Sequence, residues 1–124
     1  MNAIKNISYG LKRQELTVGE VNEQVLTLIK ELELNGYEYR YLPDLSSGQQ
    51  QRIAFARTII GKPSILLLDE PFSALNDRLC AIMQNIIKRY QEQYGMTVIY
   101  TTHNMKTARY FADRIIEMRE GVMV

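Results

Sequence analysis

The feature that most constrains this chain is a run of four apolar residues that ends on two acids. Residues 65–68 read Ile-Leu-Leu-Leu, and Asp69, Glu70 and Pro71 follow directly. An unbroken apolar run of this length is typical of a parallel strand that is buried on both faces. Because α/β folds bind ligands outside the carboxyl ends of such strands, the two acids predict a functional site there.

A helix is predicted directly before this strand. Ser46 and Ser47 are good N-cap residues, and Gly48 opens the segment. Gly61 suits the C′ position, and Pro63 prevents the helix from resuming. The apolar positions with near-helical spacing are Ile53, Phe55, Ala56, Ile59 and Ile60. Free backbone amides at the turn 46–49 would form an anion site at a helix N-terminus.

The rest of the chain alternates helices and strands. Thr17 and Glu20 form a capping box that opens a helix with an apolar stripe ending at Asn35-Gly36. A long amphipathic helix follows over 79–90 and is closed by Gly95. We expect a strand over 96–102, a helix over 104–112, a strand over 114–118, a turn over 119–121 and a truncated strand over 122–124. This order predicts a parallel α/β sheet with right-handed crossovers.

An aromatic cluster, residues 37–41, is interleaved with charged residues. It could stack nucleobases, but packing against the neighbouring helices is the favoured interpretation. The net charge of +1 indicates no polyanion partner, and the single cysteine, Cys80, cannot form an internal disulfide. No signal peptide or bilayer-spanning run is predicted, so we expect a soluble intracellular chain.

Four motifs together resemble the ATP-binding-cassette (ABC) ATPases. Residues 44–57 are similar to the family's signature segment, LSGGQQQR, and residues 65–71 are similar to its Walker B strand. Residues 73–76 resemble the D-loop, and His103, after the predicted strand 96–102, resembles the switch histidine. The motifs occur in the family's order, and the resemblance covers about three quarters of the chain. It implies an α/β, P-loop NTPase-like fold, present as an ABC ATPase fragment with a helical subdomain and the C-terminal part of a mainly parallel sheet.

The resemblance also implies a role for each site residue. Asp69 would hold Mg²⁺ through a water, Glu70 would be the general base, and His103 would position water and the γ-phosphate of ATP. The signature turn would bind ATP held by a second nucleotide-binding subunit, through Ser46, Ser47, Gly48 and Gln49. The D-loop residues, which would also lie at that dimer interface, are Ser73, Ala74, Leu75 and Asn76.

The sequence departs from the family pattern at four places. Ser47 stands where the family has glycine, and a Cβ there limits how closely backbone can approach phosphate. Asn76 replaces the usual D-loop aspartate. The P-loop, GxxxxGK[ST], is missing, because the pair Gly61-Lys62 is followed by Pro63 instead of a hydroxyl residue. The family's Q-loop glutamine is missing as well. We therefore expect the C-terminal half of a nucleotide-binding domain, with a helical subdomain over 1–62 and part of the ATPase core over 63–124.

The function implied is that of an ATP-binding subunit that couples ATP hydrolysis to solute import through a membrane permease. Such a subunit would be cytoplasmic and peripheral on the inner face of the cell membrane. One alternative is a soluble ABC ATPase that acts on DNA or ribosomes. Another is an inactive remnant, or an interaction module that lends its signature turn to another subunit.

Overall fold

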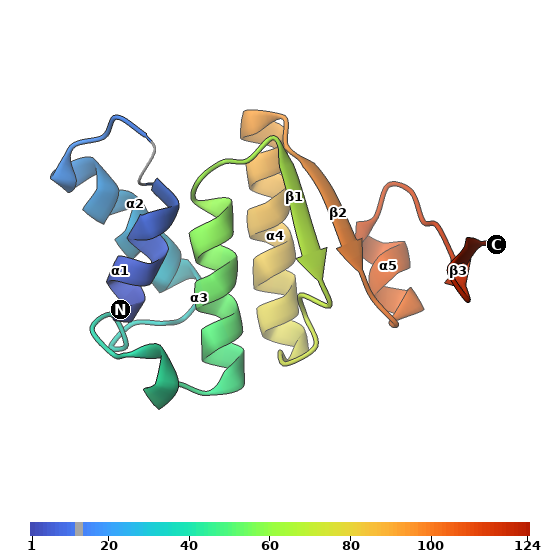
Figure 1. Cartoon of the computed structure of the whole chain (residues 1–124), viewed down its shortest axis with the longest axis horizontal. Coiled ribbons are helices and arrows are strands. Elements are labelled where there is room, and N and C mark those ends of the chain that lie inside the picture. The colour runs from blue at the N-terminus through green and yellow to red at the C-terminus, as the bar shows by residue number, and fades with distance from the viewer. Residues whose placement is uncertain (12–13) are drawn as a thin grey trace.

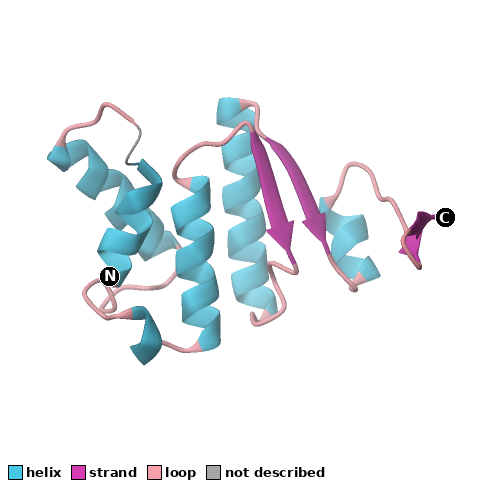
Figure 2. Cartoon of the chain, viewed as in Figure 1, coloured by secondary structure: helices cyan, strands magenta, loops and turns pink. Residues whose placement is uncertain are grey.

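The computed structural model describes residues 1–11 and 14–124. Figure 1 shows the N-terminal helices at one end of the molecule, a two-stranded sheet with α4 in the middle, and the C-terminus at the other end. Figure 2 shows that helices make up most of the structure. The elements in order are α1 (Ala3–Ser8), η1 (Tyr9–Leu11), α2 (Val18–Glu31), η2 (Leu42–Asp44), α3 (Ser47–Ile59), β1 (Ile65–Asp69), α4 (Asp77–Tyr94), β2 (Thr97–Thr101), α5 (Met105–Phe111), β3 (Met118–Arg119) and β4 (Val122–Met123).

The capping signals in the sequence are confirmed. Thr17 Oγ1 accepts from the Glu20 amide at 3.2 Å, and a Glu20 carboxylate oxygen accepts from the Thr17 amide at 2.9 Å. Gly95 ends α4 in the left-handed conformation, with φ 65°. Each cap satisfies backbone groups that would otherwise lack partners at a helix end, which is worth about 1 kcal/mol per cap.

Two helix ends differ from the prediction. Helix α2 ends at Glu31 rather than at Asn35-Gly36, because Glu33 takes a left-handed conformation with φ 58°. After α3 the left-handed residue is Lys62, with φ 51°, and not Gly61. Gly61 is required for a different reason: a Cβ on it would lie 2.9 Å from the carbonyl oxygen of Gly10. The end of α3 therefore packs directly on the backbone after α1.

One hydrophobic core joins the two halves of the chain. It contains buried residues of α1, α2 and α3, together with Leu66 of β1 and Met83, Ile86 and Ile87 of α4. Arg52 on α3 is buried within it and donates to the carbonyl oxygen of Leu32 at 2.7 Å. Burial is the main influence on this guanidinium and lowers the pKa of Arg52. The division into 1–62 and 63–124 stays a prediction, and the core is continuous across it.

The predicted parallel sheet is confirmed in its pairing. Strands β1 and β2 are parallel, with Ile65 opposite Thr97 and Asp69 opposite Thr101, and α4 makes the crossover between them.

The predicted strand over 114–118 is wrong for most of its length. Its last residue instead begins a short antiparallel hairpin, β3–β4, whose turn residues Glu120 and Gly121 have φ 51° and 78°. Positive φ at both positions is the geometry of a type I′ turn, which suits a tight hairpin.

Two predictions of burial are wrong. On β1, Leu66 is buried but Ile65 and Leu67 are 59% and 69% exposed, because helices cover only one face of the sheet within the described residues. In the aromatic cluster only Tyr37 packs against the core, whereas Tyr39 is 75% exposed.

No helix in residues 1–11 and 14–124 combines the length and apolar character needed to cross a membrane.

The uncovered face of the sheet predicts self-association. Leu67 and its register partner Ile99 lie side by side, both largely exposed. Replacing both by threonine keeps β-propensity and removes apolar area, so the apparent dissociation constant should rise by about tenfold or more. Sedimentation velocity over a concentration series measures it. Leu26→Thr, at an exposed position on α2, is the matched control and should leave association unchanged. A wild-type chain that stays monomeric throughout the series would contradict the prediction.

Candidate functional site at the carboxyl ends of β1 and β2

The two acids predicted from the sequence lie at the edge where β1 and β2 both end. The parallel register places Asp69 opposite Thr101, so the residues that follow each strand emerge on the same side. Asp69 is the last residue of β1, and Glu70 begins the loop to α4. The predicted position of the acids at a strand end is confirmed.

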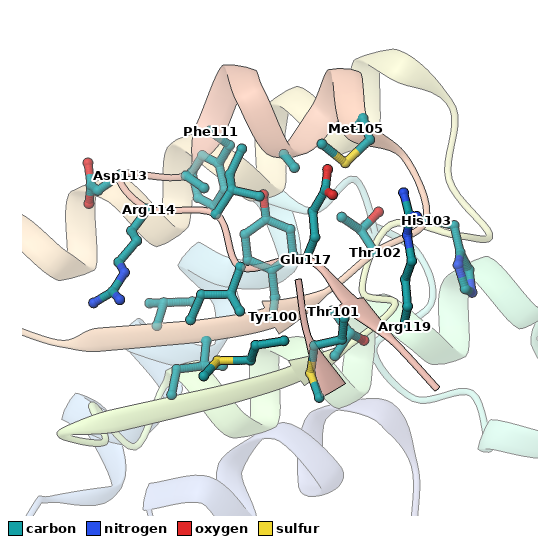
Figure 3. A pocket seen from close by; sticks show the side chains of 18 of the residues that line it. Tyr100, Thr101, Thr102, His103, Met105, Phe111, Asp113, Arg114, Glu117 and Arg119 are labelled. Carbon is teal, nitrogen blue, oxygen red and sulfur yellow. The ribbon is translucent and has the colours of Figure 1, made fainter. Parts of the chain in front are cut away.

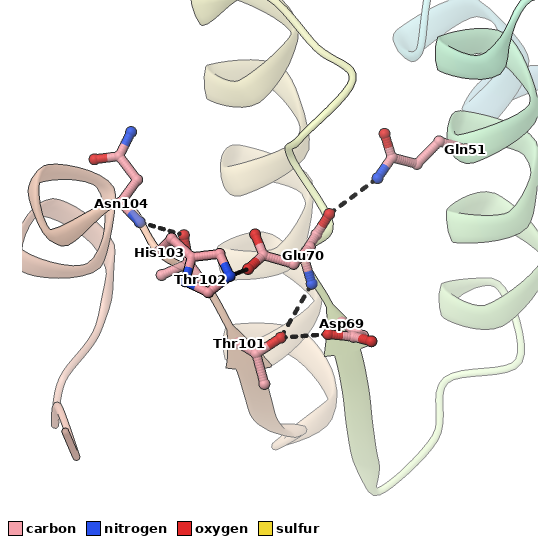
Figure 4. A network of polar contacts seen from close by, with 7 residues as sticks. All are labelled: Gln51, Asp69, Glu70, Thr101, Thr102, His103 and Asn104. Carbon is pink, nitrogen blue, oxygen red and sulfur yellow. Dashed lines mark hydrogen bonds and ion pairs between the residues drawn. The ribbon is translucent and has the colours of Figure 1, made fainter. Parts of the chain in front are cut away.

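Thr101 organises this edge, and the sequence analysis missed it. Its hydroxyl donates to Asp69 Oδ1 at 2.6 Å, and the Glu70 amide donates to the Thr101 hydroxyl and carbonyl oxygens at 3.1 and 3.2 Å. Figure 4 shows these contacts between the two strand ends. The signal available in the sequence was a hydroxyl residue at the end of the second strand. Its pairing with Asp69 depends on the strand register.

Glu70 and His103 meet across the gap between the two loops. His103 Nε2 lies 3.2 Å from Glu70 Oε1, with side chains that are 98% and 35% exposed (Figure 4). The loop after His103 is fixed by Asn104, whose amide donates to Thr102 Oγ1 at 3.0 Å and whose side chain caps α5. A carboxylate that faces solvent beside an imidazole can accept a proton from a bound water and orient it.

Two of the four backbone amides of the signature turn are hydrogen-bonded within the turn itself. Ser46 and Gln49 form a reciprocal capping box, with the Ser46 amide donating to Gln49 Oε1 and the Gln49 amide donating to Ser46 Oγ. The expectation of free amides therefore applies to Ser47 and Gly48, whose amides have no acceptor among the described residues. These two amides point out of a helix N-terminus, where an anion is stabilised.

The turn 73–76 lies against the signature turn. A Cβ built on Gly48 would lie 3.1 Å from the Ala74 carbonyl oxygen, so glycine permits the close approach. Asn76 caps α4, accepting from the Leu79 amide at 2.9 Å.

Cys80 Sγ lies 3.7 Å from the Phe72 carbonyl oxygen. Burial, followed by the nearby Asp77 charge, raises the pKa of this thiol. The shift favours the protonated thiol, which can donate to the Phe72 carbonyl oxygen.

The predicted site residues thus fall into two groups. Asp69, Glu70 and His103 share the carboxyl edge of the sheet. The second group joins the signature turn to the turn after β1, through Gly48 and Ala74. One link between the groups was missed in the sequence: Gln51 Nε2 on α3 donates to the Glu70 carbonyl oxygen at 3.1 Å.

The donor set at the sheet edge suits a metal ion that arrives with phosphate. Mg²⁺ is held in proteins by one or two carboxylates, with water and phosphate oxygens completing its shell. Asp69 supplies an exposed carboxylate at the strand end. Within the described ranges, no three His, Cys, Asp or Glu side chains gather into a group that could hold a metal ion by itself. The Asp69 carboxylate fits a cation that brings further ligands of its own.

A large hollow lies beside this edge. Its volume is 920 Å³, and its lining comes from β2, α5 and the segment that follows α5, including His103, Phe111 and Arg119. Figure 3 shows Tyr100 among these side chains. The Tyr100 hydroxyl is buried and has no hydrogen-bond partner among the described residues, and burial raises its pKa. The hollow adjoins the candidate catalytic edge and shares Thr101 and His103 with it.

Comparisons of this sequence with known proteins point to one protein family. The ABC transporter family pattern matches residues 2–73, more than half of the chain. The spermidine/putrescine import ATP-binding protein PotA of Borreliella afzelii is 40% identical over 124 residues, which are 100% of this chain and 36% of that protein. The PotA proteins of Pasteurella multocida and Vibrio vulnificus are 41% and 42% identical, over 98% and 99% of this chain and 33% of their own lengths.

Solved structures agree with the sequence relatives. A dimeric post-hydrolysis state of the ATP-binding cassette MJ0796 bound to ADP and Pi has a TM-score of 0.84 and 32% identity over 98% of this chain. A second dimeric structure of MJ0796, a bacterial ABC transporter cassette, has a TM-score of 0.85. The chain spans 53% of those cassettes and about a third of the curated relatives. The expected α/β fold of an ABC ATPase is confirmed, and the chain belongs to the ABC transporter family.

Proposed function

We propose that this chain carries the signature turn and the hydrolytic edge of an ABC subunit that couples ATP hydrolysis to solute import. The observation that carries the proposal is the 3.2 Å contact between Glu70 and His103 beside Asp69, at the carboxyl edge of a parallel sheet. Hydrolysis of a phosphoanhydride needs a positioned water, a proton acceptor and neutralisation of phosphate charge. This edge supplies residues for each requirement.

Glu70 is the proposed general base. Its carboxylate accepts the proton of the attacking water, and His103, held at that carboxylate, orients the water and contacts the γ-phosphate. Asp69, fixed by the Thr101 hydroxyl, is the proposed ligand of the nucleotide's Mg²⁺ through a bridging water. When bound there, Mg²⁺ would neutralise charge on the phosphates. The contact of Glu70 with His103 supports these roles because it brings base and orienting group to one point.

The second group of residues is proposed to act at a dimer interface. The amides of Ser47 and Gly48 bind the γ-phosphate of ATP held by a second nucleotide-binding subunit, with Ser46 and Gln49 holding the turn through their capping box. Ser73, Ala74, Leu75 and Asn76 form the adjoining D-loop. The contact of Gly48 with Ala74 supports this pairing. The ADP- and Pi-bound cassette MJ0796, which is dimeric, supports it by similarity.

The proposed cellular setting is the cytoplasmic face of the cell membrane, where the subunit binds a transmembrane permease. The similar PotA proteins are named as importers of spermidine and putrescine, so we propose polyamines as the solutes. The permease selects the solute, and this chain contributes to energising its movement. No nucleic-acid partner is proposed.

The first test removes the proposed base. The 124-residue sequence has no GxxxxGK[ST] segment, so we expect it to hydrolyse no ATP alone. A chimera with the preceding portion of Pasteurella multocida PotA should hydrolyse ATP, and Glu70→Gln should lower kcat by about 10²–10⁴-fold while ATP binding persists. A phosphate-release assay and equilibrium binding measure the two. Glu92→Gln, on an exposed part of α4, is the control. Normal turnover by the Glu70→Gln chimera would refute the assignment.

The second test concerns the signature turn. In the Glu70→Gln chimera, Ser47→Gly should leave ATP-driven dimerisation unchanged or tighter, because backbone amides and not the Ser47 hydroxyl bind phosphate. Ser47→Asp favours the helix N-terminus but repels phosphate, so it should weaken dimerisation by about tenfold or more. Light scattering with and without ATP measures the dimer. If Ser47→Gly abolished dimerisation while each subunit still bound ATP, the hydroxyl itself would be the ligand.

The third test addresses the solute. In a bacterium that lacks its own PotA, the ATPase-active chimera should restore uptake of labelled spermidine and putrescine. The Glu70→Gln chimera, at equal abundance, should not restore it, because uptake depends on hydrolysis. An active ATPase that assembles with the permease yet leaves polyamine uptake at the level of the deletion strain would exclude polyamine import.

A further inference from the structure

Gln51 is the side chain that connects the signature helix to the backbone of the proposed base. It lies in the second turn of α3, and its Nε2 donates to the Glu70 carbonyl oxygen at 3.1 Å (Figure 4). The two residues are 19 positions apart in the sequence. The other amide atom, Oε1, is buried and has no hydrogen-bond partner among the described residues. The glutamine is therefore held in place with one hydrogen bond, and that bond is to Glu70.

The backbone of Glu70 needs such support. Its φ is 47°, in the left-handed region that a side chain other than glycine rarely occupies. A conformation of this kind persists only where the surrounding contacts determine it. On the amide side, Glu70 is held by the Thr101 hydroxyl and carbonyl oxygens. On the carbonyl side, it is held by Gln51 and by the Ser73 amide at 3.3 Å.

The hydrogen bonds to the Glu70 carbonyl limit rotation of the backbone that carries its side chain. If the carbonyl lost one of its two donors, rotation about the backbone would become easier and would move the carboxylate away from His103. The first turn of α3 already contacts the same loop through Gly48 and the Ala74 carbonyl. Gln51 thus adds a second point at which α3 and the loop after β1 are fixed to each other.

We propose that Gln51 is a positioning residue for Glu70, which sets the direction of the catalytic carboxylate from the helix that carries the signature turn. The proposal rests on the function proposed above. In the proposed dimer, the signature turn faces the partner's nucleotide, whereas Glu70 acts on the nucleotide of its own subunit. Displacement of α3 by a bound phosphate therefore reaches Glu70 through Gln51, and the two sites become coupled.

A matched control exists in the same chain. Gln14 Nε2 also donates to a backbone carbonyl at 3.1 Å, that of Gly61, which follows the opposite end of α3. Both glutamines are half-buried. Gln51→Met and Gln14→Met therefore remove equivalent hydrogen bonds while keeping side-chain length, and they differ in whether the acceptor is Glu70. Gln51→Glu is a further variant, because it keeps the shape and replaces the donor with an acceptor.

The test measures catalysis and backbone protection together. In the ATPase-active chimera, Gln51→Met and Gln51→Glu should lower kcat by about tenfold and leave KM for ATP within about twofold, because the carboxylate is misplaced while nucleotide contacts persist. Hydrogen exchange over residues 69–75 should become about tenfold faster in the chimera and in the 124-residue chain. Gln14→Met should shift the melting temperature by about as much as Gln51→Met does. It should change neither kcat nor hydrogen exchange over residues 69–75.

Three other results would count against the role of Gln51 or against the proposed function. Wild-type kcat and exchange in Gln51→Met would overturn the proposal, as would an equal loss of kcat in Gln14→Met, which would indicate general destabilisation. If the wild-type chimera showed no Glu70-dependent hydrolysis, the proposed function would fail. The exchange measurement on the 124-residue chain would then decide separately whether Gln51 holds this backbone, with unchanged exchange at 69–75 counting against it.

Discussion

The parallel pairing of β1 with β2 is the interaction on which the site depends. The register places Asp69 opposite Thr101, and the two loops that leave this edge bring Glu70 and His103 to 3.2 Å. Side chains alternate between the faces of a strand, so a shift of one residue would move Thr101 away from the acids and turn Leu66 out of the core. Burial of Leu66 in the hydrophobic core therefore fixes the same register that the polar contacts require.

Close backbone packing extends this constraint to the signature helix. A Cβ on Gly10 would lie 2.1 Å from the Arg57 carbonyl oxygen, so the backbone after α1 lies directly on α3. At the other end of the helix, Gly48 approaches the carbonyl of Ala74, and Arg52 holds the last turn of α2. Such packing ties α3 to the elements around it, since it lies against the backbone of Gly10 and Ala74 and its own Arg52 reaches the end of α2.

Among the described residues, one of the four left-handed positions that carry a side chain, Glu70, lies where the chemistry is proposed. A left-handed conformation costs a residue with a side chain about 1–2 kcal/mol. Glu70 is held in it by hydrogen bonds from or to Gln51, Ser73 and Thr101. The same bonds leave its carboxylate free to face His103 and solvent. The strained backbone and the exposed carboxylate are thus two consequences of one network, and the network draws on α3, β1 and β2 together (Figure 4).

The sequence by itself determined the features that depend on residues close together in the chain. The capping box of Thr17 and Glu20, the left-handed end of α4 at Gly95 and the placement of the two acids after an apolar strand all follow from local geometry. The order of four short motifs also indicated the family. Only the tertiary structure decided which face of β1 is covered, that 118–123 form a hairpin, and that Tyr39 is exposed. It also decided the contacts of Gln51 and Thr101 with Glu70, which span 19 and 31 residues. Such contacts depend on how helices and strands pack, and no local pattern of residues encodes that packing.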